Sequence, residues 1–273
     1  MFINKNIKGE TLIELMVAVV IGLLLISSLV EIYLSSQRGY RLQDALNHLQ
    51  DNAKLATNFL KSDIQQAGYI GCARLTNDFP IASYSSSYAI TPQNKLTGSD
   101  TQFTVRHLVF PNVILKTMQD ASTIEVSKEI NIHAGDVLII ADCNKAEIFQ
   151  AESVSSSQQS QKIITTSPLQ NKYEAYAEIG PFEINTYYIA KTDHTEKNGT
   201  PIYSLFVKNN DGNTELVENI NHMQLTYSIY QDGKLTDVPA SEVDDWSRIR
   251  GVAIDLDLVS STLKKTWHLY VAL

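Results

Sequence analysis

The stretch GETLIELMVAVVIGLLLISSLVEIYL, residues 9–34, decides the fold of this chain. Only eight residues precede it, and Lys5 and Lys8 are among them. From residue 12 to residue 34 about 23 residues, at a rise of ~1.5 Å each, make roughly 35 Å of helix, enough to cross a ~30 Å hydrocarbon core. Glu14 lies near the start of this apolar run, where a carboxylate without a partner costs up to a few kcal/mol. Glu14 is therefore a functional candidate, and its partner has to be sought.

Two ordinary interpretations compete for this segment. A secretory signal peptide has a shorter apolar region of ~7–15 residues and a small-residue cleavage site after it, and no such site follows residue 34. A plain membrane anchor fits the length, and Lys5 and Lys8 favour a cytoplasmic N-terminus. Arg38 and Arg41 nearly balance that charge on the other flank, and an anchor has no use for Glu14.

The segment resembles the class III leader of type IV pilins and pseudopilins, in which a short basic leader ends in Gly and is cleaved before an apolar run. The resemblance implies a leader of residues 1–9, cleavage between Gly9 and Glu10, and Glu14 as the fifth mature residue, which is usually Glu in that family. Glu10 stands where the family usually has Phe as the first mature residue, the site of N-methylation.

The chemistry of Glu14 can be stated from the residue itself. In a bundle of apolar helices a carboxylate needs a cation, and an α-amine with a pKa near ~7.7–8.0 on a neighbouring subunit is a suitable one. Such a pair favours one axial stagger between subunits, so Glu14 is predicted to set the register of assembly.

Beyond the apolar run the helix turns amphipathic. Apolar residues spaced by threes and fours form one face: Leu42, Leu46, Leu49, Ala53, Ala56, Leu60, Ile64 and Ala67. No proline occurs before Pro80, and Gly68 is placed to end the helix in the left-handed conformation. We therefore predict one helix over 10–67, with 10–34 spanning the membrane. A coiled coil is disfavoured because the pattern covers few heptads.

The remaining residues, 68–273, have the texture of β structure. Asn209–Gly212 and Gln231–Gly233 are predicted hairpin turns, and the Ser/Gln-rich stretch Ser153–Gln161 is predicted to be an exposed loop. The predicted strands are Phe103–Phe110, Thr123–Val126, Asp136–Ala141, Ile184–Ala190, Tyr203–Val207, Met223–Tyr230, Val252–Val259 and Trp267–Ala272. The fold class is thus α+β, with one long N-terminal helix packed on a single globular, mainly antiparallel β-rich domain that is large enough for a sizeable core.

Cys72 and Cys143 both lie in this β-rich part. In an exported domain such a pair is expected to form a disulfide, which ties the end of the helix to a strand ending at Asp142. Metal ligation and redox chemistry are the alternatives, but neither cysteine belongs to a CxxC motif or has a nearby His.

These residues extend the resemblance to one family of type IV minor pilins, the PilW family. The segment AGYIGC, residues 67–72, is similar to its AGYxGC motif, and residues 40–45 and 135–150 carry further matches. The resemblance implies a pilin-like fold and a minor subunit that primes pilus assembly near the tip.

The catalytic and ligand-binding patterns in the sequence are weak. Ser261–Lys264 matches SxxK without its companion motifs. Asp255 and Asp257 share a strand face, and a solvated face is favoured over a cation site. The six histidines show no metal-ligand spacing, and no phosphate-binding glycine motif is present. We expect no catalytic residue, no cofactor and no metal. A net charge of −8 argues against general nucleic-acid binding, with Lys264-Lys265 beside Trp267 as the nearest basic patch.

The sequence predicts a structural subunit rather than an enzyme. The partners implied by the resemblance are other minor pilins, the major pilin, a prepilin peptidase, the inner-membrane assembly platform and, as a further candidate, a tip adhesin. The chain is expected in the inner membrane with a cytoplasmic N-terminus and a periplasmic domain, and after assembly in a surface pilus. A type II secretion pseudopilin is the alternative within the class, and a membrane-tethered periplasmic enzyme or binding protein is the alternative outside it.

Overall fold

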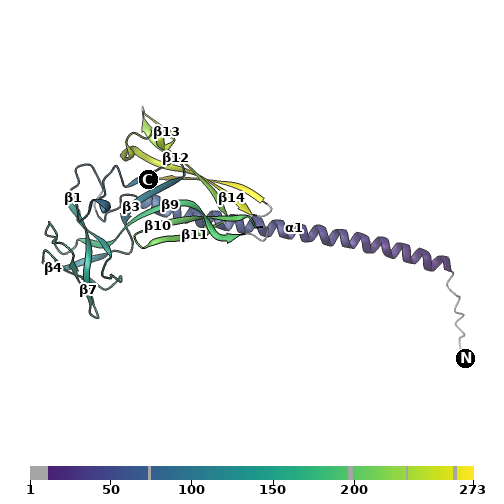
Figure 1. Cartoon of the computed structure of the whole chain (residues 1–273), viewed down its shortest axis with the longest axis horizontal. Coiled ribbons are helices and arrows are strands. Elements are labelled where there is room, and N and C mark those ends of the chain that lie inside the picture. The colour runs from purple at the N-terminus through teal and green to yellow at the C-terminus, as the bar shows by residue number, and fades with distance from the viewer. Residues whose placement is uncertain (1–11, 73–74, 196–198, 232, 261–262) are drawn as a thin grey trace, which may run out of the picture. The chain divides into compact units, whose positions relative to one another are not determined.

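The computed structural model of the chain describes residues 12–72, 75–195, 199–231, 233–260 and 263–273. Within these ranges the chain forms one α-helix, α1 (Leu12–Gln66), followed by fifteen strands and three short 3₁₀ helices (Figure 1). The chain divides into two compact units, residues 1–48 and 49–273. The first holds the apolar part of α1, and the second holds the end of α1 together with all the strands.

Helix α1 ends as its sequence predicts. Gly68 has a φ of +79°, the left-handed conformation that glycine adopts without steric cost. The amide N–H groups of Ala67 and Tyr69 donate to the carbonyls of Ile64 and Gln66, which closes the last turn. The predicted apolar face is confirmed from Leu49 onward, where Leu49, Ala53, Ala56, Leu60 and Ile64 are all buried.

The first eleven strands form one large sheet. Their bounds are β1 (Ile81–Ser83), β2 (Leu96–Gly98), β3 (Gln102–Leu108), β4 (Val113–Asp120), β5 (Thr123–Ser127), β6 (Val137–Asp142), β7 (Lys145–Ser156), β8 (Ser160–Thr165), β9 (Glu178–Thr195), β10 (Pro201–Asn209) and β11 (Gly212–Glu218). All pairs in this sheet are antiparallel except β1 with β7. Strand β9 is central, because its first residues pair with β4 and β6 and its later residues pair with β3 and β10.

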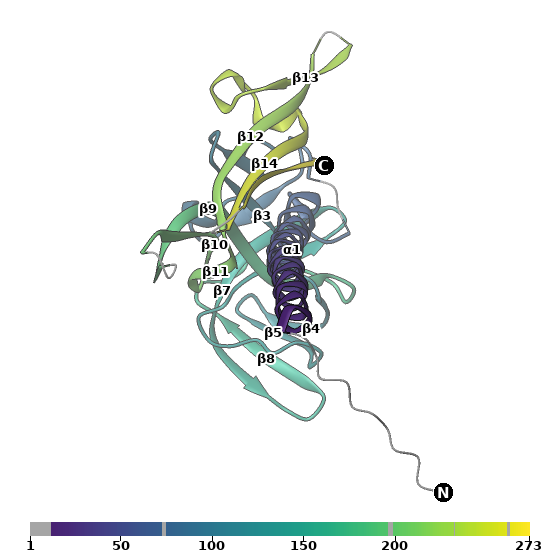
Figure 2. The ribbon, with the colours of Figure 1, turned by 90° about the vertical axis from the view of Figure 1, so that its right-hand side faces the viewer.

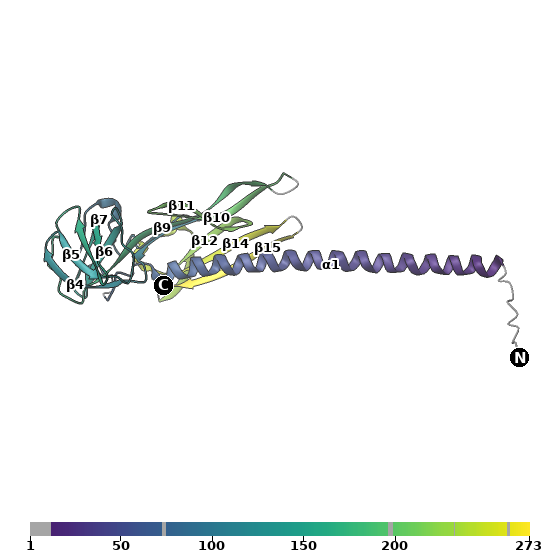
Figure 3. The ribbon, with the colours of Figure 1, turned by 90° about the horizontal axis from the view of Figure 1, so that it is seen from below.

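The last four strands form a second antiparallel sheet in the order β13-β12-β14-β15 (Figure 2). Their bounds are β12 (Ile220–Gln231), β13 (Lys234–Val238), β14 (Ile249–Ser260) and β15 (Leu263–Ala272). The buried face of α1 shares one core with residues of β3, β9, β10, β12 and β14. A second core lies within β4–β9, whose strands β4–β7 gather at one end of this unit (Figure 3).

The predicted α+β class, a long apolar helix with a mainly antiparallel β-rich domain, is confirmed. The turn at Asn209–Gly212 is also confirmed, since Asn209 pairs with Gly212 between β10 and β11. Gln231 pairs with Lys234 across the second predicted turn. The loop predicted for Ser153–Gln161 is wrong, because β7 continues to Ser156 and β8 begins at Ser160. Polar side chains are accommodated there on an exposed hairpin whose backbone is paired.

Leu42 was expected on the packed face of the helix but is 47% exposed, and Leu46 is only partly buried. An amphipathic period predicts which residues share a face and does not tell where along the helix burial begins.

Candidate functional site

The apolar part of α1 is the first functional feature. Glu14 lies in the first turn of the helix, where a carboxylate interacts favourably with the helix dipole. The large apolar side chains from Leu12 to Leu34 are all substantially exposed, between 44% and 76%. By length and composition this helix could cross a membrane. Gly9 and Glu10, the predicted cleavage residues, lie outside the described residues.

The second feature is a buried polar cluster at the other end of α1. Asp63 points from the helix to the sheet, and its Oδ2 accepts hydrogen bonds from Asn185 Nδ2 and Tyr187 Oη, both at 2.7 Å. Both partners are on β9. Its Oδ1 lies 3.7 Å from Nε2 of His107 on β3, a distance that makes an ion pair rather than a hydrogen bond. Three elements thus converge on one carboxylate.

The charges of this cluster support each other. Burial lowers the pKa of His107, but Asp63, the Leu108 carbonyl and the charge of Glu183 outweigh it and hold the pKa above its ordinary value. Burial raises the pKa of Asp63, but the contacts with His107, Tyr187 and Asn185 lower that pKa by more. The net shift of the Asp63 pKa is therefore downward. Nδ1 of His107 donates to the Leu108 carbonyl at 3.0 Å, which leaves Nε2 facing the carboxylate.

His107 is only 2% exposed, so this cluster is closed to substrates. We call the contacts of Asp63 with Asn185, Tyr187 and His107 the clasp, because they join the helix to the sheet. Sequence reasoning missed it, although one signal was available: Asp63 stands three residues after Leu60 and beside Ile64, at the edge of the apolar face, where a charge needs a partner.

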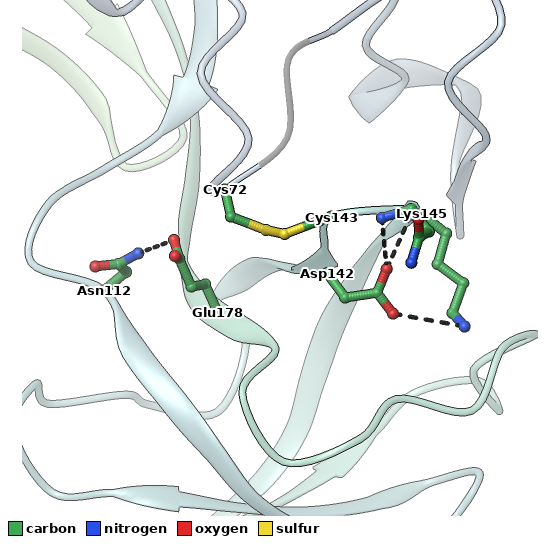
Figure 4. Close-up of a disulfide and its surroundings, with 7 residues drawn as sticks. Cys72, Asn112, Asp142, Cys143, Lys145 and Glu178 are labelled. Carbon is green, nitrogen blue, oxygen red and sulfur yellow. Dashed lines mark hydrogen bonds and ion pairs between the residues drawn. A yellow bond between two sulfur atoms is a disulfide. The ribbon is translucent and has the colours of Figure 1, made fainter.

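The third feature is the disulfide between Cys72 and Cys143, predicted from the sequence and present in the structure (Figure 4). It joins the segment after α1 to the β6–β7 turn, with Cα atoms 5.4 Å apart. Asp142 orders that turn, because its Oδ1 accepts from the backbone N–H groups of Asn144 and Lys145 at 2.8 and 3.0 Å. Its Oδ2 lies 3.5 Å from Lys145 Nζ.

Each residue of the AGYIGC segment has a defined place in this region. The Tyr69 ring stacks on Phe110 with ring centroids 4.9 Å apart, and Ile70 is fully buried. Gly71 has a φ of +102°, and a Cβ there would lie 3.1 Å from a carboxylate oxygen of Glu178. Asn112 holds that same carboxylate through a 2.6 Å hydrogen bond (Figure 4).

The two aspartates of the weak cation-site pattern pair with side chains of the neighbouring strand. Asp255 is paired with His268 at 2.7 Å, and Asp257 accepts from Thr266 and lies 3.2 Å from Lys264 Nζ. These contacts cross the outer face of β14 and β15, as the solvated-face interpretation predicts. Within the described residues no group of three or more His, Cys, Asp or Glu side chains could hold a metal ion. Ser261, the first residue of the SxxK match, lies outside the described residues.

Comparison with known protein families gives one match: residues 4–30 carry the prokaryotic N-terminal methylation motif. No curated protein and no solved structure matches the chain. The motif, together with the long apolar helix and the β-rich domain, supports a type IV pilin-like protein, a class that comprises pilins and pseudopilins. It points to a structural subunit that is processed by a prepilin peptidase and interacts with other pilus components.

Proposed function

We propose that this chain is a minor pilin of the PilW type, a subunit of the complex that primes type IV pilus assembly and sits near the fibre tip. One observation carries the proposal: the methylation motif leads into a helix whose last turns are part of the core of the β-rich domain. A cleaved anchor or a flexible tether would not be built into that core. A helix through which a subunit assembles would be part of the core of the domain that it carries.

The AGYIGC segment supports the PilW assignment. Its two glycines have positive φ, its tyrosine and isoleucine pack, and its cysteine is bonded, so the spacing of the motif matches a specific corner of the fold. The AGYIGC segment follows directly after the end of α1, so it connects the helix to the β-rich domain.

In this proposal a prepilin peptidase cleaves between Gly9 and Glu10 on the cytoplasmic side. The new α-amine of one subunit then approaches Glu14 of its neighbour and fixes the axial register. Before assembly the helix holds the subunit in the inner membrane with its β-rich domain in the periplasm. The partners are the major pilin, the other minor pilins and the assembly platform, with a tip adhesin as a further candidate.

The first test is the mass of the N-terminal peptide of membrane-extracted protein, from strains with and without the peptidase. We expect a peptidase-dependent start at Glu10, and an added methyl group would show that Glu10 is accepted in place of Phe. A start at Met1 in both strains would reduce the apolar segment to an anchor and overturn the proposal.

Glu14→Ala tests the register role. We expect the variant to insert into the membrane at wild-type level but to be missing from sheared surface fibres. Glu31→Ala is a matched control, because Glu31 is a second carboxylate on the same exposed helix and has no assigned partner subunit. Equal incorporation of both variants would contradict the proposal. Absence of the wild-type chain from sheared fibres would favour a pseudopilin.

A further inference from the structure

The outer face of the sheet formed by β3, β9 and β10 is the floor of an open groove of about 1010 Å³. The 3₁₀ helix η1 (Ser86–Tyr88) and the β10–β11 turn contribute the rest of its lining. Small-molecule sites have volumes of about 300–1,000 Å³, so this groove is at the upper end of that range. It therefore has room for a ligand of several linked units.

The register of the strands arranges the floor in rows. Tyr188 of β9 pairs with Gln102 of β3 on one side and with Phe206 of β10 on the other. In the next row on the same face, Thr186 pairs with Thr104, and their hydroxyl oxygens are 2.7 Å apart. Successive residues of a strand face opposite sides, and the intervening residues Phe103, Tyr187 and Leu205 lie in the core. The sheet thus buries one face and leaves this polar face to the groove.

The lining is polar but almost without charge. Among the described residues that line the groove, hydroxyl and side-chain amide groups predominate, Lys208 is the one cation and none is a carboxylate, although the chain has 30 acidic residues. Within the described part of the chain, the side chains of Gln102 and Asn213 make no hydrogen bond to another residue, so they are available to a ligand. An amide donates and accepts at once, as hydroxyl-rich ligands require.

Two tyrosine rings add flat apolar surface to this polar lining. Tyr88 stacks on Tyr84 with ring centroids 5.6 Å apart, and Tyr188 stacks on Phe206 at 5.8 Å. Each ring is held in place by its neighbour before any ligand arrives, which reduces the entropy that binding costs. A tyrosine combines an apolar ring with a polar tip and can contact the C–H face of a sugar while its hydroxyl meets polar groups.

We propose that this groove binds a neutral oligosaccharide. An apolar ligand would leave the amides and hydroxyls of the lining unpaired, at a cost for each. A phosphate-rich ligand would need more cations than Lys208, because phosphate recognition relies on clustered positive charge. A chain of uncharged sugars matches both the mixed donors and acceptors and the fixed rings. This function is separate from assembly through Glu14, so each can fail alone.

The experiment uses the full chain in detergent and saturation-transfer NMR with four probes: the neutral sugars maltotriose, triacetylchitotriose and mannotriose, and a sulfated maltotriose as the charged comparison. We expect at least one trisaccharide to bind. Tyr188→Ala should weaken that binding by about tenfold or more, as expected for loss of a stacking contact. Tyr230→Ala is the matched control, because Tyr230 is 55% exposed on β12, outside the groove, and its loss should change nothing.

A second variant tests whether weaker binding reflects a lost contact or a misfolded protein. Gln102→Ala combined with Asn213→Ala alters only exposed side chains, so it should keep the wild-type circular dichroism spectrum and weaken binding as well. Three results would overturn the proposal: no binding of any trisaccharide, binding that both groove variants retain, or binding of a sulfated trisaccharide alone.

Discussion

Replacing Asp63 by Ala tests the clasp between helix and sheet. The change removes two hydrogen bonds to a charged acceptor and leaves His107 and Tyr187 buried without their partner. Breaking one member of a buried ion pair costs about 3–5 kcal/mol. Because the Asp63 side chain is 15% exposed, water can replace part of the loss, and we expect about 3 kcal/mol.

The assay is urea unfolding of the full chain in detergent, followed by the fluorescence of Trp246 and Trp267, both of which pack against the core that holds the helix. Asp51→Ala is the matched control, since Asp51 is on the same helix and its ion pair with Lys54, at 3.9 Å, is exposed. An exposed pair contributes under about 1 kcal/mol, so this variant should unfold almost as the wild type does.

The clasp also predicts a pH dependence. The folded pKa of His107 is raised, so its contribution is complete below the unfolded value of about 6.5 and is lost as the pH rises through the folded value. The folded pKa of Asp63 is lowered, so its contribution is complete above the unfolded value near 3.8 and is lost as the pH falls through the folded value. The clasp is therefore strongest between about pH 4 and 6.5.

Asp63→Asn isolates this effect, because the amide oxygen can still accept from Asn185 and Tyr187 while the charge is gone. The difference in stability between wild type and Asp63→Asn should shrink as the pH rises above 6.5, the unfolded-state value for a histidine. A difference that stays constant from pH 6 to 9, or an Asp63→Ala variant as stable as Asp51→Ala, would refute the reasoning.

Three further changes probe the rest of the domain by the same unfolding assay. Replacing Cys72 and Cys143 by Ser should cost about 4 kcal/mol by the chain-entropy estimate for a loop of 71 residues, and an unchanged urea midpoint would contradict that estimate. Leu60→Ala should lower the free energy of unfolding by about 2–5 kcal/mol because Leu60 is fully buried. Leu55→Ala should lower it by less than about 1 kcal/mol because Leu55 is 44% exposed. Equal losses for the two variants would mean that the buried face of the helix is assigned wrongly. Gly98→Ala should cost about 1–3 kcal/mol, because the new Cβ would lie 2.9 Å from a backbone Cα of β3, and wild-type stability would show that this strand can shift.

The sequence was most informative where periodicity and local chemistry decide the structure. The face from Leu49 to Ile64, the left-handed Gly68 and the Asn209–Gly212 turn all follow from residues close together in the chain. The cysteine pair was predicted because two cysteines in an exported domain have few other uses.

The contacts that could not be predicted are those made by pairing across the fold. Strand β7 runs on through Ser153 to Ser156 because β8 pairs with it, not because serine favours strands. Asp63 and His107 meet only because β3 and β9 pair in one register beside α1, which no local pattern encodes. The groove has the same origin, since its rows combine the consecutive strands β9 and β10 with β3, which lies far earlier in the sequence.

The disulfide has a mechanical consequence. If tension on the helix peels the chain away from its N-terminal side, unravelling stops at Cys72, because that residue is covalently held to Cys143. The chain between the two cysteines, which are 71 positions apart in the sequence, then forms a closed loop that force cannot extend. At about 3.3–3.6 Å per extended residue, roughly 250 Å of chain is withheld from stretching. A load on the helix would thus pass through the disulfide to the β6–β7 turn, and strands β1–β6, which lie between the two cysteines in the sequence, would not be in its path.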